Sequence, residues 1–433
     1  MLKFSAFIKS IPAINFWLIA SLLSVGCSSY KYSHSSRDIM SSKNIFLEDL
    51  LKQYPQYFGT ILNNRDSFRV QIIYSRIDRN KNNRPVFTHH YFNVDPHYYF
   101  YPASTVKMPI ALLALEKVKK LKKYGINKNS AMITEADHSS QAPVYNDPSS
   151  PDGKPTIAHY IKKIFLVSDN DASNRLYEFL GQNYLNKTLH KKRYKTAEIL
   201  HRLSINMNED QNRHTNPVKF LNDTGSLAYE QNGQVSAIVF PTRNILMGSS
   251  YISNNKLIHE PFNFSKKNRI ALTDLQAILQ SILFPFSVPK KQRFRISDED
   301  RKFIFQYMSR YPSETIYPQY DSSAWDSNGK FLLWGSEKRA LPKHIHVFNK
   351  IGGAYGFLTD VAYVADFEKN IEFMLSAIIY CNSDGIFNDD RYDYEKVGLP
   401  FMKHLGEVIY DFEAQRPRQY IPDLTEFKMA YEK

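Results

Sequence analysis

Cysteine is nearly absent from this 433-residue chain, which contains only Cys27 and Cys381. Two distant cysteines cannot form the disulfide framework that stabilises small secreted proteins. Long apolar runs are also scarce, because no segment after residue 27 offers the roughly 20 uninterrupted apolar residues that a membrane-spanning helix needs. No glycine-rich phosphate loop is present. The sequence therefore excludes a disulfide scaffold, a multipass membrane protein and a phosphate-loop nucleotide-binding protein.

The bulk composition is that of a globular protein, with 43% hydrophobic and 23% charged residues and enough length for two domains. A formal net charge of +13 would permit binding to nucleic acid, anionic lipid or an acidic wall polymer. The lysines are nevertheless scattered, and their densest cluster, Lys117–Lys123, is typical of the solvated end of a helix. Because basic and aromatic residues are not grouped into a binding platform, we predict no nucleic-acid partner.

The N-terminal segment has the pattern of an export signal. Lys3 and Lys9 precede an apolar run that ends at Gly26-Cys27, which predicts a signal peptide over residues 1–26. Residues 22–27 resemble a bacterial lipoprotein box, although the leucine stands four places before the cysteine instead of three. We therefore expect lipidation of Cys27 and a membrane anchor, the alternative being a cleaved signal with an incidental cysteine. Polar residues 27–42 are the expected flexible tether, and the periplasmic face of the cell envelope is the expected location.

Apolar periodicity predicts an α+β fold. Strands are expected where β-branched and aromatic residues cluster, and helices where apolar residues recur every three to four positions. The expected order is a helix over 47–54, strands over 68–77 and 85–92, a helix over 104–121, a mainly helical region over 156–285, strands over 361–366 and 371–380, and a helix over 394–412. Thr156 is the expected N-cap of a helix over 157–167. One sheet is thus predicted to combine both ends of the chain, while 187–251 and 285–343 are expected to be loops or insertions.

A serine and a lysine three residues apart on a helix lie on one face, where the amine can accept the hydroxyl proton. The chain holds this spacing at Ser28, Ser104, Ser253, Ser287 and Ser327. Only Ser104-Thr105-Val106-Lys107 opens an apolar-periodic helix, whose Pro109 either bends the first turns or shifts the helix start. Taken alone, this spacing favours a simple N-cap at Ser104 and a surface lysine at Lys107.

Two further motifs change this interpretation. Ser168-Asp169-Asn170 follows the helix over 157–167, and Lys350-Ile351-Gly352-Gly353 stands where a strand is expected to begin. Together they could bring a hydroxyl, an amide and a second ammonium to the serine, as proton relay, substrate-amide contact and anion anchor. S-x-x-K, S-D-N and K-T-G, in this order, form the signature of class A β-lactamases and penicillin-binding proteins.

The three motifs resemble those of the class A β-lactamase-related serine hydrolases over residues 45–415. This resemblance implies a β-lactamase/transpeptidase-like fold, with an antiparallel sheet flanked by helices and an active site in the cleft beside a helical domain. The implied boundaries are 43–125 and 344–415 for a discontinuous α/β domain, 126–343 for a mainly helical domain with insertions, and 416–433 for a C-terminal tail.

The resemblance also implies a role for each motif residue. The expected catalytic residues are the nucleophile Ser104, its proton acceptor Lys107, the proton shuttle Ser168 and the electrostatic anchor Lys350. The expected substrate contacts are Asn170, Gly352 and Gly353. The backbone N–H groups of Ser104 and Gly353 would form the oxyanion hole, which is usually the largest single catalytic contribution.

The chain departs from the family pattern in two places. Ile351 replaces the usual threonine or serine, so this position offers no side-chain hydrogen bond to a substrate carboxylate. The Glu-x-x-Leu-Asn loop that activates the deacylating water is missing. Glu209 is the nearest substitute in the chain, and the alternative is that it is an ordinary exposed carboxylate. Without such a base, a β-lactam would acylate Ser104 and remain bound.

Metal chemistry is not expected despite 13 histidines. His89 and His90 would point to opposite faces of a strand, and His344 and His346 lack neighbouring ligands at metal-binding spacing. No organic cofactor is expected either.

The sequence thus predicts a serine acyl-hydrolase that acts on a β-lactam or a related amide. A cell-wall D,D-peptidase or esterase of the same fold is the nearest alternative, so the substrate is a small molecule or a fragment derived from peptidoglycan. The third hypothesis is a catalytically silent envelope-binding lipoprotein. Its distinguishing feature would be a Lys107 beyond hydrogen-bond reach of Ser104.

Overall fold

A computed structural model describes residues 45–431 of the chain. The predicted signal peptide over 1–26, the tether over 27–42 and Cys27 lie outside the described residues. Within the described range, no helix combines the length and the apolar character needed to cross a bilayer.

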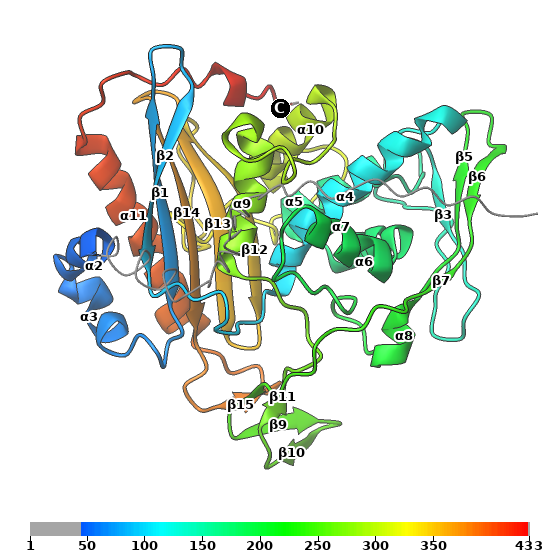
Figure 1. Cartoon of the computed structure of the whole chain (residues 1–433), viewed down its shortest axis with the longest axis horizontal. Helices are drawn as coiled ribbons and strands as arrows, with labels where there is room; N and C mark the ends of the chain where they lie inside the picture. The colour runs from blue at the N-terminus through cyan, green and yellow to red at the C-terminus, as the bar shows by residue number, and fades with distance from the viewer. Residues whose placement is uncertain (1–44, 432–433) are drawn as a thin grey trace, which may run out of the picture.

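A five-stranded antiparallel sheet forms the centre of the molecule, in the order β12-β13-β14-β1-β2 (Figure 1). Its strands are β1 Gln71–Arg79, β2 Pro85–Phe92, β12 Ile345–Ala354, β13 Phe357–Asp366 and β14 Ile371–Tyr380. β1 from the N-terminal part pairs with β14 from the C-terminal part, with Tyr74 opposite Leu375. The α+β class and the assembly of one sheet from both chain ends are therefore confirmed.

Helices cover both faces of this sheet, so the central strands β13 and β14 are buried on both sides, whereas the edge strand β2 is mostly half-buried. Alternate residues of β1 point to opposite faces. Ile72 and Tyr74 pack in a core with α2 (Ile45–Lys52), α3 (Pro55–Asn63) and α11 (Leu399–Gln415). Ile73 and Ile77 pack in the second core, which contains α9 (Leu272–Leu283). Burial on both faces explains why β13 and β14 are rich in apolar residues along their whole length.

Beside the sheet lies a helical layer that carries two of the three sequence motifs. It consists of α4 (Lys107–Lys120), α5 (Ile157–Val167), α6 (Asn170–Leu180), α7 (Gln182–Lys191) and α10 (Asp298–Ser309). The Thr156 hydroxyl caps α5 by accepting the His159 N–H at 3.0 Å, as predicted. A 3-10 turn, Ala103–Val106, precedes α4, so the α-helix containing Pro109 starts at Lys107 instead of Ser104.

The prediction that residues 156–285 are mainly helical is wrong for the segment 214–263. Figure 1 shows this segment as short strands to the right of and below the sheet. They are β4 His214–Thr215, β5 Val218–Leu221, β6 Leu227–Gln231, β7 Gln234–Val235, β8 Leu246–Met247, β9 Ser250–Ser253, β10 Lys256–Ile258 and β11 Phe262–Asn263. β3 Met132–Thr134, α8 Glu209–Arg213 and β15 Ile386–Phe387 complete this part. These strands are only two to five residues long, which is too short to show a readable hydrophobic period.

The C-terminal part packs against the core. The predicted helix over 394–412 begins as a π-turn, Tyr394–Gly398, and continues as α11 to Gln415. The segment called a tail then returns to the sheet, where the Phe427 ring centroid lies 4.8 Å from that of Tyr363. Phe427 is buried, so the described part of this segment belongs to the folded core.

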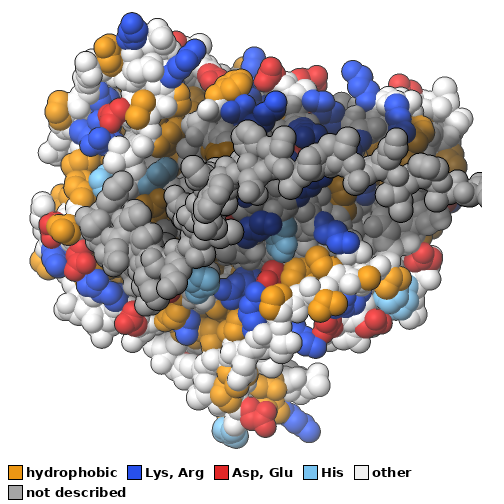
Figure 2. All heavy atoms as spheres, viewed as in Figure 1, with side chains coloured by type: hydrophobic (Ala, Val, Ile, Leu, Met, Phe, Trp, Pro, Cys, Tyr) orange, Lys and Arg blue, Asp and Glu red, His pale blue; other side chains and the backbone are white. Residues whose placement is uncertain are grey.

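Charged side chains of both signs are distributed over the surface. Figure 2 shows basic side chains on many parts of one face, with acidic side chains among them. The β9–β10 hairpin protrudes at the lower edge, where β9 pairs with β10 on one side and with β15 on the other. The hairpin is thereby tied to the loop that follows β14.

Candidate active site

Ser104 lies on the 3-10 turn that precedes α4, and it lines a cavity of about 530 Å³. The preceding Ala103 has a left-handed backbone, with φ of 45°. Such a conformation is uncommon for a residue with a Cβ and is frequently found beside functional groups. The cavity is lined by Tyr101, Ala103, Ser104, Asn170, Leu203, Ser204, Gly353, Ala354, Tyr355, Asn388, Asp390, Tyr392 and Tyr394.

Strand β12 runs directly against this turn. A Cβ added to Gly352 would meet the Pro102 carbonyl oxygen at 2.6 Å and the Ser104 amide nitrogen at 3.1 Å. Only glycine permits this approach. Lys350 is the sixth residue of the ten-residue strand, so the expectation that the motif stands at a strand start is wrong. The apolar residues before it already belong to β12.

Lys107 is buried beneath the cavity, with no exposed side-chain surface. Its Nζ donates hydrogen bonds to Asn170 Oδ1 at 2.6 Å, to Ser168 Oγ at 3.3 Å and to the Ser168 carbonyl oxygen. Burial lowers the pKa of Lys107 to about 7, and the negative charge of Asp169 only partly opposes this effect. A large fraction of the amine is therefore neutral near pH 7 and able to accept a proton.

Lys350 reaches the same hydroxyl from the sheet. Its Nζ donates to Ser168 Oγ at 2.8 Å and to the Ile351 carbonyl oxygen at 3.0 Å. Burial and the neighbouring charge of Lys107 hold the pKa of Lys350 well below its usual range. Ser168 ends α5 in a left-handed conformation, with φ of 58°, which places its hydroxyl between the two lysines. The structure thus brings together Lys107, Ser168, Asn170 and Lys350.

The predicted contact between the Ser104 hydroxyl and the Lys107 amine is not formed. Among the described residues, Ser104 Oγ makes no hydrogen bond to Lys107, whose donors are directed to Ser168 and Asn170. The two residues lie within one turn, because the Lys107 N–H bonds the Ser104 carbonyl oxygen. Catalytic hydrogen bonds are often long without substrate and shorten in the reactive complex.

Several residues that line the cavity were not predicted from the sequence. Ser204 Oγ accepts a hydrogen bond from Asn170 Nδ2 at 2.8 Å and so orients a motif residue. Asp390, Tyr392 and Tyr394 come from the segment after β14, and Tyr355 comes from the turn between β12 and β13. Tyr355 follows Gly353 by two residues, so its position beside the third motif could have indicated that it lines the cavity. Ser204, Asp390, Tyr392 and Tyr394 show no such signal in the sequence.

Glu209 is placed away from Ser104. Its carboxylate pairs with Arg213 at 3.1 Å and with Lys266, and these cations lower its pKa. It lines a second cavity of about 700 Å³, and Ser104 is not among the residues lining that cavity. The structure therefore does not bring the proposed substitute base to the nucleophile.

Glu209→Gln is accordingly expected to change the lifetime of any acyl group on Ser104 by less than about twofold, because no proton transfer at Ser104 involves this carboxylate. Intact-mass spectrometry of the acylated full chain over time measures the lifetime. A lifetime lengthened tenfold or more would show that Glu209 reaches the acyl group after all.

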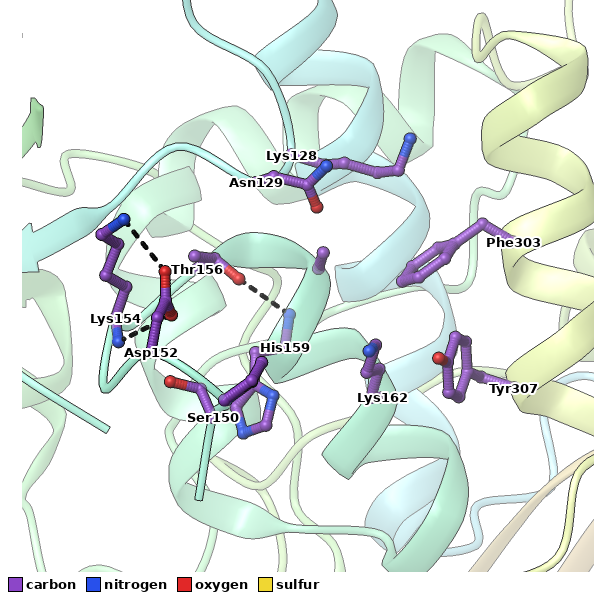
Figure 3. A pocket seen from close by; sticks show the side chains of 12 residues that line it. Lys128, Asn129, Ser150, Asp152, Lys154, Thr156, His159, Lys162, Phe303 and Tyr307 are labelled. Carbon is purple, nitrogen blue, oxygen red and sulfur yellow. Dashed lines mark hydrogen bonds and ion pairs between the residues drawn. The ribbon is translucent and has the colours of Figure 1, made fainter. Parts of the chain in front are cut away.

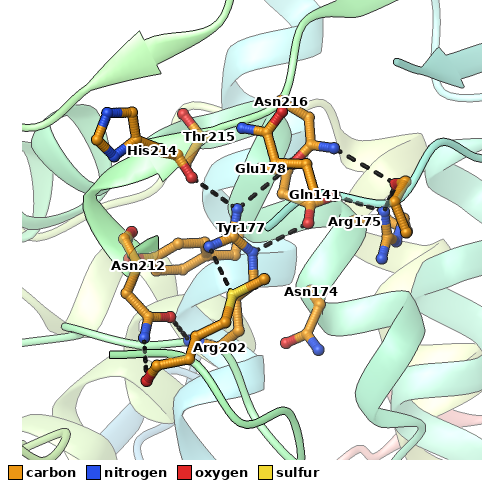
Figure 4. A network of polar contacts seen from close by, with 12 residues as sticks. Gln141, Asn174, Arg175, Tyr177, Glu178, Arg202, Asn212, His214, Thr215 and Asn216 are labelled. Atoms are coloured by element: carbon orange, nitrogen blue, oxygen red, sulfur yellow. Dashed lines mark hydrogen bonds and ion pairs between the residues drawn. The ribbon is translucent and has the colours of Figure 1, made fainter. Parts of the chain in front are cut away.

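A buried ion-pair network holds the segment 200–216 that walls both cavities (Figure 4). Arg202 Nε donates to Glu178 Oε1 at 3.0 Å, and its Nη2 donates to the His214 carbonyl oxygen at 2.9 Å. Glu178 also pairs with Arg175 at 2.8 Å. The arginine thus ties α6 to the C-terminal end of α8.

Arg202→Met should destabilise the fold by about 3 kcal/mol, because it leaves the buried Glu178 short of one cation and frees the His214 carbonyl oxygen. Urea denaturation of the full chain measures this loss. Lys154→Met, which removes an exposed partner of Asp152, is the control and should leave the midpoint unchanged. Equal midpoints for the two variants would contradict the structural role of Arg202.

A third cavity, of about 340 Å³, lies at the start of α5 and is separate from the Ser104 cavity (Figure 3). Its lysines already have partners. Lys154 pairs with Asp152 at 2.9 Å, Lys128 pairs with Glu299 at 2.6 Å, and Lys162 lies over the Tyr307 ring at 5.1 Å. No motif residue lines it.

One group of the described residues approaches metal-ligand geometry, although no metal is expected from the sequence. The ligand atoms of His138, Asp210 and His214 lie within 4.8 Å of one another. Zinc ligands in a tetrahedral site lie about 3.5 Å apart. His138 Nδ1 already accepts the Ser140 N–H at 3.3 Å, and His214 Nδ1 contacts the Asp210 carbonyl oxygen at 3.0 Å. His214 Nδ1 also lies 3.8 Å from Asp210 Oδ2, which is close to the spacing of zinc ligands.

Comparison with known proteins relates this arrangement to one family. Residues 61–237 match the model of the beta-lactamase enzyme family. No curated protein matches the chain.

Solved structures named beta-lactamase are also similar to the chain. One from Sphaerobacter thermophilus DSM 20745 is 12% identical, with a TM-score of 0.41, covering 80% of this chain and 92% of that one. One from Xanthomonas campestris pv. campestris str. ATCC 33913 is 12% identical, with a TM-score of 0.43, covering 86% and 97%. One from Burkholderia phymatum is 11% identical, with a TM-score of 0.45, covering 88% and 100%.

The family match covers the turn that carries Ser104 and the helices that carry Lys107, Ser168 and Asn170. The sheet order and its flanking helices form the expected α+β arrangement. The match thus relates residues 61–237 to the beta-lactamase enzyme family.

Proposed function

We propose that this chain is a serine acyl-hydrolase of the class A β-lactamase-like type, acylated at Ser104 by a β-lactam or a related amide. The observation that carries the proposal is the buried Lys107, whose pKa of about 7 leaves a neutral amine one turn from Ser104. A neutral amine is the base that a serine nucleophile requires.

Acylation begins with two coupled events at Ser104. The Lys107 amine accepts the hydroxyl proton while Ser104 Oγ attacks the carbonyl carbon of the amide. The carbonyl oxygen becomes an oxyanion, which the backbone N–H groups of Ser104 and Gly353 stabilise. Gly352 supports this geometry because it lets β12 approach the turn closely enough for both amides to face one cavity.

Collapse of this intermediate breaks the bond between carbon and nitrogen. The proton held by Lys107 passes through Ser168 Oγ to the leaving nitrogen, because the Ser168 hydroxyl lies 3.3 Å from Lys107 Nζ and 2.8 Å from Lys350 Nζ. Lys350 keeps the hydroxyl oriented and places a second cationic group beside the reaction. Asn170 holds both Lys107 and, in this proposal, the substrate amide.

The structure offers fewer groups for deacylation than for acylation. Segment 200–213 supplies no carboxylate to the Ser104 cavity, and Asp390 is the only acidic residue among those lining it. Ile351 adds no side-chain donor for a substrate carboxylate. These two features favour the second candidate function, a cell-wall D,D-peptidase or esterase of the same fold in which a β-lactam adduct persists.

The third hypothesis is a catalytically silent envelope lipoprotein. The absent hydrogen bond between Ser104 and Lys107 within the described residues is what this hypothesis predicts, and it is equally compatible with an enzyme that awaits its substrate. We also propose that Cys27 is lipidated and that the chain is exported to the periplasmic face of the envelope, where a peptidoglycan-derived substrate would be present. The mass of the mature N-terminal peptide tests this part.

The decisive experiment is intact-mass spectrometry of the full chain incubated with a penicillin, with Ser104→Ala as the control. We expect one adduct, which the control lacks. Rapid loss of the adduct would establish β-lactamase turnover, and a persistent adduct would favour the D,D-peptidase-like role. The complete absence of an adduct, with a correctly folded chain, would leave the esterase and the silent lipoprotein, which acyl esters then distinguish.

A further inference from the structure

The second cavity adjoins the cavity of Ser104. Tyr355 lines both of them. Their common wall is the segment 203–207, in which Leu203 and Ser204 face the Ser104 cavity, while Ile205, Asn206 and Met207 face the other. Two adjoining cavities of about 530 and 700 Å³ exceed what a compact ligand fills. They fit one elongated ligand that passes Tyr355.

The second cavity is basic. Four cationic residues line it, Arg213, Arg243, Lys266 and Lys267, against two carboxylates, Glu198 and Glu209. Both carboxylates already form ion pairs with these cations. Arg243 holds Glu198 with a bidentate pair, Nη2 to Oε1 being 2.5 Å, and Glu209 is shared by Arg213 and Lys266.

Lys267 differs from the other three cations because its ammonium is not paired with a carboxylate within the described residues. Its contacts are the Tyr355 hydroxyl at 3.5 Å and the rings of Phe262 and Tyr355, with centroids at 5.5 and 5.6 Å. An ammonium has three donors, so most of its hydrogen-bonding capacity is available to a ligand. Tyr355 in turn packs edge-on against Tyr101, with centroids 5.0 Å apart, which joins Lys267 to the wall of the Ser104 cavity.

The Ser104 cavity itself offers no comparable cation. Lys107 and Lys350 are buried, and both donate to Ser168. Ile351 has no side-chain donor. Among the described residues that line the two cavities, Lys267 is therefore the cation without a carboxylate partner.

We propose that the two cavities form one groove for an elongated, peptide-like acyl substrate, and that Lys267 binds a carboxylate at the end remote from the bond that Ser104 attacks. The inference rests on the proposed acylation of Ser104 and adds the substrate class and a specificity-determining residue. The bound carboxylate accepts a charge-assisted hydrogen bond from the ammonium, and the stem of the substrate passes over the Tyr355 ring.

Binding is tested separately from turnover in the Ser104→Ala background of the full chain. The probes are synthetic peptides in matched pairs over a series of lengths, identical except that the N-terminal cap, remote from the acyl carbonyl, carries a free carboxylate (succinyl) in one and the corresponding carboxamide in the other. Isothermal titration calorimetry measures Kd at low and moderate salt. We expect the best carboxylate peptide to bind about tenfold more tightly than its carboxamide twin.

Lys267→Gln should remove this tenfold preference and Lys267→Arg should retain most of it. Lys256→Gln, which removes an exposed lysine from β10 outside both cavities, should leave it unchanged. Equal affinity for the twins in the parent, or loss of preference in Lys256→Gln as well, would overturn the proposal. Acylation of chains with Ser104 by thioester versions of the same peptides is scored independently. Tighter binding of the carboxylate peptides without acylation of Ser104 would support the Lys267 site and contradict the proposed hydrolase. Acylation of Ser104 without this difference in Kd would support the hydrolase and contradict the Lys267 site.

Discussion

Replacing Lys107 by methionine is expected to lower the rate of Ser104 acylation by about 10³-fold, because a positioned general base typically contributes 10²- to 10⁴-fold. Methionine preserves the apolar stem and much of the volume in this buried site but cannot accept a proton. The rate of adduct formation with a penicillin, followed by intact-mass spectrometry, measures the effect.

Lys117→Met is the matched control for this substitution. Lys117 lies on the same helix, is also largely buried and has a pKa that burial lowers to about 7. Its Nζ donates to Gln231 Oε1 at 2.6 Å, away from the Ser104 cavity. The control should lose stability without a change in acylation rate. Similar rates in the two variants would remove Lys107 from the mechanism.

The pH dependence of the acylation rate should also reflect Lys107 acting as the base. Because burial lowers the pKa of Lys107 to about 7, the amine is protonated and inactive below this pH and neutral above it. The rate should therefore rise with pH, with a midpoint near 7, and level off above about pH 8. A rate that is flat between pH 5.5 and 8.5 would argue against a neutral lysine base.

Gly352→Ala is expected to reduce acylation by about 10²-fold and to destabilise the fold by about 2 kcal/mol. The added Cβ would lie 2.6 Å from the Pro102 carbonyl oxygen and 3.1 Å from the Ser104 nitrogen. Both of these neighbours are backbone atoms, so the turn carrying the nucleophile must move away from β12. Adduct formation and urea denaturation measure the two losses.

Gly59→Ala is the control for the loss of a glycine. A Cβ there would meet only Pro55 Cβ at 3.8 Å, an ordinary contact, and helix α3 should gain about 0.5–1 kcal/mol. The prediction for Gly352 fails if its alanine variant acylates at the parent rate. Such a result would mean that the turn yields without disturbing Ser104.

The sheet and the motif residues were predictable because their signals are local. The predicted strands over 85–92 and 371–380 coincide with β2 and β14, whose runs of apolar and β-branched residues fit a half- or fully buried strand. The Thr156 cap was equally readable, because the capping hydroxyl and the N–H that it accepts are three residues apart. The order of the three motifs indicated a common site.

The remaining parts of the site depend on contacts between distant segments. Ser204 meets Asn170 across 34 residues of sequence, and Asp390 reaches the cavity from a loop without periodicity. The strands between residues 214 and 263 were missed for a different reason, because two to five residues are too few to show a period. Glu209 looked available as a base because sequence shows neither Arg213 and Lys266 around it nor the cavity that it faces.

By itself, the sequence determined the α+β class, the pairing of the chain ends in one sheet and the identity of the motif side chains, because hydrophobic period and residue chemistry are properties of short segments. Only the tertiary structure decided the depth at which Lys107 and Lys350 are buried, and therefore their lowered pKa values. The structure likewise decided that the Ser104 cavity adjoins a basic one at Tyr355. Desolvation and proximity arise from the whole packed chain, and no single segment contains them.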